Sequence, residues 1–253
     1  MQEAILEARG VAKRFGAVVA ASDINVKVGP GERVGLIGSN GAGKTTFVNM
    51  ITGYLKPDVG QIRLAGADIT RLAPRAINML GVKRSFQIPQ LFGELSVLEN
   101  MLVALACRDG RSGFLRSARD PLRVEQADGL LRRFRLLEHR RRRVGELPGG
   151  VRKLLDIAMA LTARPKLLLL DEPTSAVAAD EKFQMMDTIM SALEEDPETP
   201  VLFVEHDMDI IGCHATRVIA FYSGRIIADG APASVLAQDD VRRYVTGELS
   251  TQG

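Results

Sequence analysis

The residues with the clearest chemical meaning occupy positions 38–45, which read Gly-Ser-Asn-Gly-Ala-Gly-Lys-Thr. The spacing GxxxxGK followed by Ser or Thr is typical of a loop whose backbone N–H groups hold nucleotide phosphates at the positive end of a helix. We expect Lys44 to reach the β- and γ-phosphates and Thr45 to place its hydroxyl on Mg²⁺. The expected nucleotide-binding residues here are Gly38, Ser39, Asn40, Gly41, Ala42, Gly43, Lys44, Thr45 and Thr46.

A second candidate for phosphate chemistry is an acidic pair that ends the apolar run at 167–170. A continuous apolar run fits a parallel strand buried on both faces. At the carboxyl end of such a strand, Asp171 is placed to hold the water shell of Mg²⁺. Glu172 is placed to orient or deprotonate a water that attacks the γ-phosphate. Taken alone, the pattern also fits a strand closed by an acidic cap before Pro173, but the phosphate loop upstream favours the functional interpretation.

The elements that must position these residues alternate in type. Short apolar runs at 5–8, 24–28 and 33–37 predict an antiparallel lead-in and then a buried strand before the phosphate loop. Helical spacing over 46–55 stops at Lys56-Pro57, and residues 60–64 return as a strand. The order predicts an α/β protein.

Composition narrows the class of protein. The chain has 253 residues, 46% hydrophobic and 25% charged, which suits one large domain or one domain with a helical insertion. Because apolar runs stay short of about 18 residues and the start lacks a signal-peptide pattern, we expect a cytoplasmic protein. Cys107 and Cys213 lack metal-type spacing. The arginine-rich run at 132–143 could bind nucleic acid or anionic lipid, although a solvated helix face and loop is favoured.

Further residues gain meaning from their order along the chain. Gln87 follows an Arg-Ser-Phe stretch, a Gly-Gly pair at 149–150 opens a helix, and His206 ends a predicted strand. Singly, Gln87 fits a surface glutamine and His206 a strand-end histidine. The order of these motifs along the chain resembles that of the ATP-binding cassette (ABC) ATPases: a phosphate loop, a glutamine, a Gly-Gly segment, an acid pair and a strand-end histidine. The resemblance covers essentially the whole chain.

The resemblance implies an enzyme that binds ATP with Mg²⁺ and hydrolyses it. Residues 38–46 resemble the Walker A loop and residues 171–172 the Walker B pair, while Gln87 is similar to the Q-loop glutamine and His206 to the switch histidine. Phe15 is at the position of the family's aromatic residue that stacks on adenine. The implied catalytic residues are Glu172, His206 and Gln87, and the implied metal ligands are Thr45, Gln87 and Asp171.

Part of the family pattern is altered. In this family two ATPase domains pair head to tail. Each nucleotide-binding site is completed by the signature segment of the partner domain, which normally reads Leu-Ser-Gly-Gly-Gln. That segment here is Leu147, Pro148, Gly149 and Gly150, followed by Val151. Ala178 stands where the family has Asp or Asn. Because both departures concern the partner's nucleotide, we hypothesise a heterodimer with a second ABC ATPase, with a homodimer as the alternative.

Within the family, the chain resembles the ATPase subunits of branched-chain amino-acid importers. The similarity lies in residues 86–92, Leu98-Glu99-Asn100, a longer insertion at about 108–125, residues 204–208 and the tail 223–230. It implies transport of branched-chain amino acids or a related small polar solute, and a place on the cytoplasmic face of the membrane. Implied partners are permease subunits that dock near Gln87, Phe92 and Glu99 and, indirectly, a periplasmic solute-binding protein; no nucleic acid is expected.

The expected architecture is a P-loop α/β core with an antiparallel β subdomain, formed by residues 1–87 and 163–253, and a helical subdomain at about 88–162. One alternative is the ATPase of a lipid or lipopolysaccharide exporter, which fits residues 204–208 less well. Another is a soluble ABC ATPase acting on nucleic acid or ribosomes, which the arginine-rich run alone favours. A third, a nucleotide-binding regulator without hydrolysis, is disfavoured by Glu172 and His206.

Overall fold

The computed structural model describes residues 3–110, 120–175 and 177–246. These residues form two compact units. The first contains 1–82, 166–169 and 197–253, and the second contains 83–165 and 170–196. The domain division expected from the sequence stays a prediction. Of the expected insertion at 108–125, residues 111–119 lie outside the described part of the chain.

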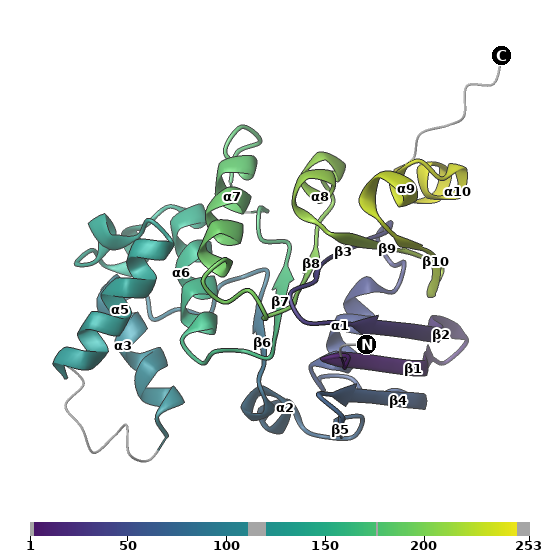
Figure 1. Cartoon of the computed structure of the whole chain (residues 1–253), viewed down its shortest axis with the longest axis horizontal. Coiled ribbons are helices and arrows are strands. Elements are labelled where there is room, and N and C mark those ends of the chain that lie inside the picture. Colours follow the sequence, from purple (N-terminus) through teal and green to yellow (C-terminus); the bar gives the residue numbers. More distant parts are fainter. Residues whose placement is uncertain (1–2, 111–119, 176, 247–253) are drawn as a thin grey trace. The chain divides into compact units, whose positions relative to one another are not determined.

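The first unit contains a four-stranded antiparallel sheet in the order β2-β1-β4-β5 (Figure 1). Along β2, buried positions alternate with accessible ones from Ile24 to Val28, as expected for a sheet with one face on the core. The lead-in strands are longer than the apolar runs predicted, because residues outside those runs also pair across the hairpin, with Arg14 opposite Val19 and Phe15 opposite Val18. The strands are β1 Leu6–Phe15, β2 Val18–Val28, β4 Val59–Leu64 and β5 Ala67–Asp68.

A six-stranded, mainly parallel sheet has the order β10-β9-β3-β8-β7-β6. Its central strand β3 pairs in parallel with both β8 and β9, and four of its five residues are buried. Burial of both faces explains the apolar runs that the sequence shows at these strands. The bounds are β3 Arg33–Ile37, β6 Val82–Ser85, β7 Leu167–Asp171, β8 Val201–Val204, β9 Arg217–Tyr222 and β10 Arg225–Gly230.

Helices of the first unit pack against these sheets, and residues of β1, β2, β3, β4, β7, β8, β9 and α1 contribute to the core. Helix α1 ends at Ile51, earlier than the predicted Leu55, because Gly53 adopts a left-handed φ of 76° and a Cβ there would lie 2.6 Å from Ile77. The helices are α1 Lys44–Ile51, α2 Pro74–Leu80, α8 Met208–His214, α9 Pro232–Leu236 and α10 Asp239–Val241, followed by a π-helical turn Arg242–Thr246.

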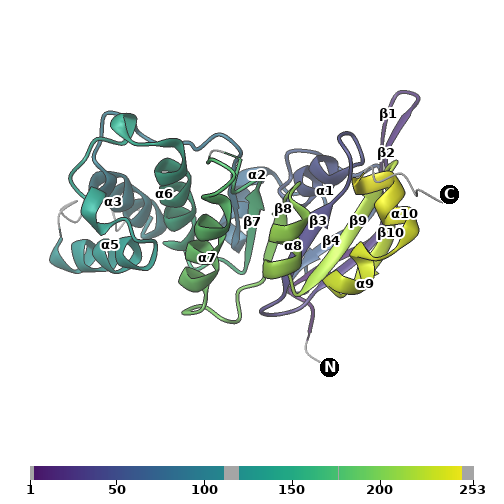
Figure 2. The same ribbon diagram turned by 90° about the horizontal axis from the view of Figure 1, so that it is seen from above.

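The second unit is built mainly from helices that pack against one another (Figure 2). Helix α3 begins with a capping box in which Ser96 and Glu99 satisfy each other's backbone N–H groups. Leu131, Phe134 and Leu155 are fully buried among these helices. The helices are α3 Val97–Arg108, α5 Pro121–Arg133, α6 Gly149–Leu161 and α7 Lys182–Leu193, with 3₁₀ turns Leu137–His139 and Val144–Glu146. No described helix is long and apolar enough to cross a bilayer.

Candidate functional site

The phosphate loop connects β3 to α1 in the first unit, as the sequence predicts. Two of its glycines are required by close backbone neighbours. A Cβ on Gly38 (φ 152°) would lie 2.5 Å from the carbonyl oxygen of Phe221, and one on Gly43 (φ 109°) 2.7 Å from that of Ala20. The loop is therefore held between β2 and β9 by contacts that exclude any side chain at these positions.

Lys44 is the first residue of α1 and is buried, with 6% of its surface exposed. Its ammonium group donates to the carbonyl oxygens of Gly38, at 2.5 Å, and Ser39, at 3.1 Å. Thr45 beside it is exposed. Because α1 has no side-chain cap among the described residues, its first N–H groups and the Lys44 ammonium together form a positive end suited to an anion.

His206 lies in the same unit, in the connection from β8 to α8. Since β3 and β8 are neighbouring parallel strands, the phosphate loop and His206 leave the sheet at the same edge. The preceding Glu205 is buried, with 4% exposed, and its carboxylate accepts from the His206 backbone N–H at 3.3 Å. Asp207 caps α8, so the strand-end position predicted for His206 is fixed on both sides.

Phe15 ends β1 at the tip of the β1–β2 hairpin and is 52% exposed. The Lys13 ammonium lies 5.7 Å from its ring centroid and also pairs with Asp58 at 2.6 Å. An aromatic ring displayed on the same unit as the phosphate loop suits stacking on a nucleotide base.

The acidic pair and Gln87 lie in the second unit. The Gln87 amide donates to the Glu172 carboxylate at 2.7 Å, so the structure brings two expected catalytic residues into contact. Glu172 has a left-handed φ of 44°, and its carbonyl accepts from both the backbone N–H and the hydroxyl of Ser175, which secures this turn after β7. Asp171, at the end of β7, is paired with Arg84 at 2.5 Å.

The altered signature segment opens α6, and Pro148 is its N-cap residue, with no side-chain cap there among the described residues. Gly150 is tightly covered, because a Cβ on it would lie 2.4 Å from Val177. Pro148, Gly150, Val177 and Ala178 line one open hollow of about 380 Å³. The two segments that depart from the family pattern are thus neighbours in the fold.

Three charged residues that the sequence did not single out contact Asp171 or the segment around Gln87. Arg84 holds Asp171, and its guanidinium lies 5.0 Å from the Phe86 ring centroid. Lys153 and Asp156, both on α6, contact the segment around Gln87. Burial raises the pKa of the Asp156 carboxyl, although the Ser85 hydroxyl that donates to it at 2.6 Å acts in the opposite direction. The sequence signal that could have revealed Lys153 and Asp156 is their position among the apolar residues that repeat along the buried face of the helix.

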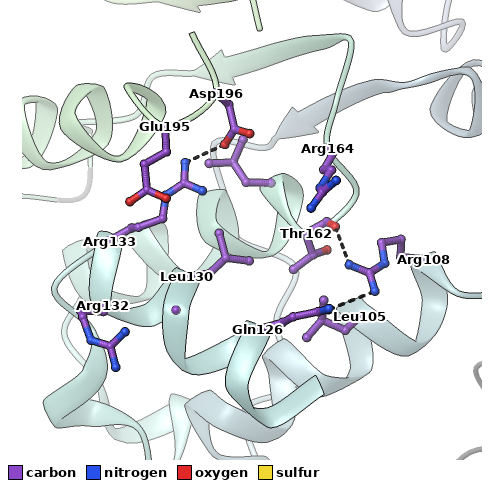
Figure 3. Close-up of a pocket in the computed structure, with 12 residues that line it drawn as sticks. Leu105, Arg108, Gln126, Leu130, Arg132, Arg133, Thr162, Arg164, Glu195 and Asp196 are labelled. Carbon is purple, nitrogen blue, oxygen red and sulfur yellow. Dashed lines mark hydrogen bonds and ion pairs between the residues drawn. The ribbon is translucent and has the colours of Figure 1, made fainter. Parts of the chain in front are cut away.

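Part of the arginine-rich run has structural partners. Arg140 pairs with Asp128 at 2.5 Å, and Arg133 pairs with Asp196 at 2.7 Å and donates to the carbonyl of Ala192. Arg133 lines an open hollow of about 780 Å³, in which Arg108 donates to Gln126 at 3.1 Å (Figure 3). These contacts favour the interpretation as a helix face and loop for Arg133 and Arg140.

Comparisons with known proteins decide the family. A model of the ABC transporter family matches residues 21–175. The chain is 35% identical over 257 residues to the high-affinity branched-chain amino acid transport ATP-binding protein LivG of Escherichia coli K12, covering 98% of this chain and 100% of the relative. The chain belongs to the ABC transporter family.

Further similarities agree with this membership. This ABC protein is also 35% identical to the transport ATP-binding protein BraF of Pseudomonas aeruginosa, with the same coverage of 98% and 100%. The crystal structure of an ATP-binding cassette of an ABC transporter in its ADP conformation superimposes with a TM-score of 0.84 at 31% identity, covering 98% of this chain and 100% of that one. The ABC ATPase fold expected from the sequence is confirmed, and the chain is a nucleotide-binding ATPase.

Proposed function

We propose that this chain is the ATP-hydrolysing subunit of an importer for branched-chain amino acids or a related small polar solute, bound to the cytoplasmic face of the membrane. The full-length similarity to LivG carries the proposal. The alternative of a lipid or lipopolysaccharide exporter gains no support from the relatives reported above. Within the first unit, the phosphate loop and His206 follow neighbouring parallel strands, and in the second unit the acid pair lies at the end of β7; these are the groups that ATP binding and hydrolysis require.

In this proposal, different residues bind ATP and hydrolyse it. Lys44 and the loop amides bind the phosphates, Phe15 stacks on adenine, and His206 contacts the γ-phosphate. Glu172 accepts a proton from the water that attacks the γ-phosphorus, so that ATP and water give ADP and phosphate, and Gln87 orients that water.

Magnesium fits the oxygen donors of Thr45, Gln87 and Asp171, because a hard cation prefers carboxylate, amide and hydroxyl oxygens. When bound, it neutralises charge on the phosphate oxygens. Arg84 neutralises the Asp171 carboxylate at 2.5 Å, so the proposal requires Asp171 to exchange this ion pair for the metal's water shell. Arg84 is thereby proposed to set how readily Asp171 serves the metal.

Permease subunits are proposed to dock beside Gln87. Phe92 and Ile88 expose 54% and 75% of their surfaces there, although they are large and apolar. The Phe92 backbone is fixed by Asn100, a fully buried residue whose side chain accepts from the Phe92 N–H at 2.9 Å and donates to its carbonyl at 3.1 Å. A rigid backbone with an exposed ring suits transmission of movement from Gln87 to a bound permease helix.

The second ATPase of the complex is proposed to be a different chain. Pro148 lacks both a hydroxyl and an N–H, and Ala178 lacks any polar side-chain atom, although both line the same hollow. A partner with an intact signature would complete the site built on Lys44 and Glu172, while the partner's own site would face this altered surface.

Purification from native membranes tests the proposed assembly. A tagged full-length chain is expected to bring two permease subunits and a second ABC ATPase, and the purified complex, reconstituted in vesicles, is expected to accumulate leucine when ATP is supplied. Uptake of urea or an amide in place of leucine would identify another solute of the same class. Co-purification of nucleic acid or ribosomes without permeases would contradict the importer assignment.

A further inference from the structure

Helix α6 turns two charged side chains toward the interior of the second unit. Lys153 is fully buried, at 0% exposure, and Asp156 follows it by three residues, which places both on one face of the helix. A buried ammonium group is costly unless hydrogen bonds replace its water. The hydrogen bonds of Lys153 therefore indicate why a charged side chain is buried at this position.

The Lys153 ammonium bridges two segments that are distant in sequence. It donates to the carbonyl oxygen of Phe86 at 2.6 Å and to that of Asp171 at 2.9 Å. Phe86 immediately precedes Gln87, and Asp171 immediately precedes Glu172. One cation thus fixes the backbone just before both side chains that meet at 2.7 Å.

Asp156 holds the same segment at one more point. Its carboxylate accepts from the Ser85 hydroxyl at 2.6 Å. The segment that leads into Gln87 is consequently tied to α6 at Ser85 and at Phe86. The same helix begins at Gly149, directly after Pro148, so the tie also joins Gln87 to the signature segment.

We propose that Lys153 is a positioning residue for hydrolysis: it sets the distance between Gln87 and Glu172 and couples both to the start of α6. The inference rests on the proposed roles of Gln87 and Glu172. Lys153 itself touches backbone carbonyls, so its removal is expected to affect turnover and leave nucleotide affinity, which depends on the first unit, unchanged. A displacement of about 1 Å in such a constellation can lower a rate about a hundredfold.

Steady-state ATP hydrolysis by the full-length chain is the first test. Lys153→Met keeps the length of the side chain and removes its donors. We expect kcat to fall about ten- to hundredfold with KM unchanged within about twofold, and Lys153→Arg, which keeps a cationic donor, to recover most of the loss. The matched control is Lys83→Met, a half-buried lysine on β6 of the same unit, which is expected to leave kcat unchanged.

The Glu172→Gln background separates positioning from general damage. If Lys153 acts through Gln87 and Glu172, Lys153→Met is expected to change the residual rate of Glu172→Gln by less than about twofold. Equal losses in both backgrounds would overturn the inference. Normal hydrolysis by Lys153→Met alongside a slow Glu172→Gln enzyme would also overturn it, while leaving the proposed function intact.

Hydrogen exchange provides a readout that does not depend on turnover. Lys153→Met is expected to speed amide exchange in residues 85–90 and 171–175, whereas exchange in residues 38–46 is expected to match the unmodified chain. If Glu172→Gln hydrolysed ATP normally, the proposed base would be wrong, and this exchange pattern would still decide whether Lys153 fixes the two segments. Unchanged exchange in both segments would overturn the inference.

Discussion

The phosphate loop and the signature segment both place glycines before a helix, yet they differ in what surrounds those glycines. A Cβ added to Gly38 or Gly43 would lie 2.5 or 2.7 Å from a backbone carbonyl oxygen, whereas a Cβ added to Gly150 would lie 2.4 Å from the side chain of Val177. The loop keeps every residue of its motif, while Pro148 in the signature and Ala178 in the segment after the acid pair stand where the family pattern has polar residues. We therefore propose that binding a nucleotide and completing a partner's nucleotide site are separable tasks of this chain.

The largest effects are expected at the residues proposed to act on this chain's own nucleotide. Glu172→Gln is expected to lower kcat about 10²- to 10⁴-fold with ATP affinity unchanged, because an amide cannot accept the proton of the attacking water. Lys44→Ala is expected to lower ATP affinity by about a hundredfold, since charge-assisted hydrogen bonds are lost. Binding of a fluorescent ATP analogue and phosphate release distinguish the two variants; hydrolysis by Glu172→Gln at the unmodified rate would contradict the assignment.

Matched glycine substitutions test the difference in surroundings. Gly38→Ala is expected to destabilise the chain by about 3 kcal/mol, because the opposing carbonyl of Phe221 belongs to a sheet and cannot move. Gly150→Ala is expected to cost about 1 kcal/mol or less, because Val177 can shift and alanine favours the helix. Urea denaturation measures both. Equal costs would mean that the signature glycine is as tightly constrained as the loop glycine.

A smaller effect is expected when the serine of the family signature replaces Pro148. Pro148→Ser restores the hydroxyl that the family uses, so ATPase activity of the chain paired with itself is expected to rise about ten- to hundredfold. Pro148→Ala is the matched control, since it removes the proline ring without adding a hydroxyl. A vigorous, cooperative ATPase from the unmodified chain, with no gain from Pro148→Ser, would show that the helix end and the glycines suffice.

Phe15 tests whether base stacking contributes to the intact site. Phe15→Ala is expected to weaken ATP binding about tenfold, because stacking on an aromatic ring is lost. Its stability cost is expected to be small, since 52% of the residue is exposed. The neighbouring Val18→Ala, at 65% exposure, serves as the control in the same titration. Equal affinities of the Phe15 variant and the unmodified chain would remove Phe15 from the site.

The smallest expected effect is a pH dependence of stability caused by Asp156 on α6, the helix that begins after Pro148. The pKa of Asp156 is raised in the folded chain by burial, so the folded state holds the proton more tightly than the unfolded state. The stability contribution of this group is therefore present at low pH and is lost as pH rises through the raised pKa. Asp156→Asn keeps an acceptor for Ser85 and is expected to become relatively more stable from about pH 4 to pH 7.

Denaturation of the two proteins side by side measures this difference, because the titrations of all other carboxylates cancel. A stability difference that is constant over the range would show that the Asp156 carboxyl titrates normally.

Much of the site was predictable because its motifs are local. The loop 38–45 and the acid pair 171–172 each combine a recognisable pattern with an apolar strand, and the structure places the loop directly after β3 and Asp171 at the end of β7. The end of α1 was predicted wrongly because the left-handed turn at Gly53 overrides the helical period that continues to Leu55. The ion pair of Arg84 with Asp171 was missed because the two residues are 87 positions apart.

The sequence by itself determined the family, the order of the phosphate-binding elements and the loss of polar groups at Pro148 and Ala178, because these depend on residue type and local spacing. The tertiary structure decided which of these residues meet. Lys153 reaches Phe86 across 67 positions and Asp171 across 18, and Val177 covers Gly150. Such contacts depend on how helices and strands pack, since a buried charge must find its partners wherever the fold brings them.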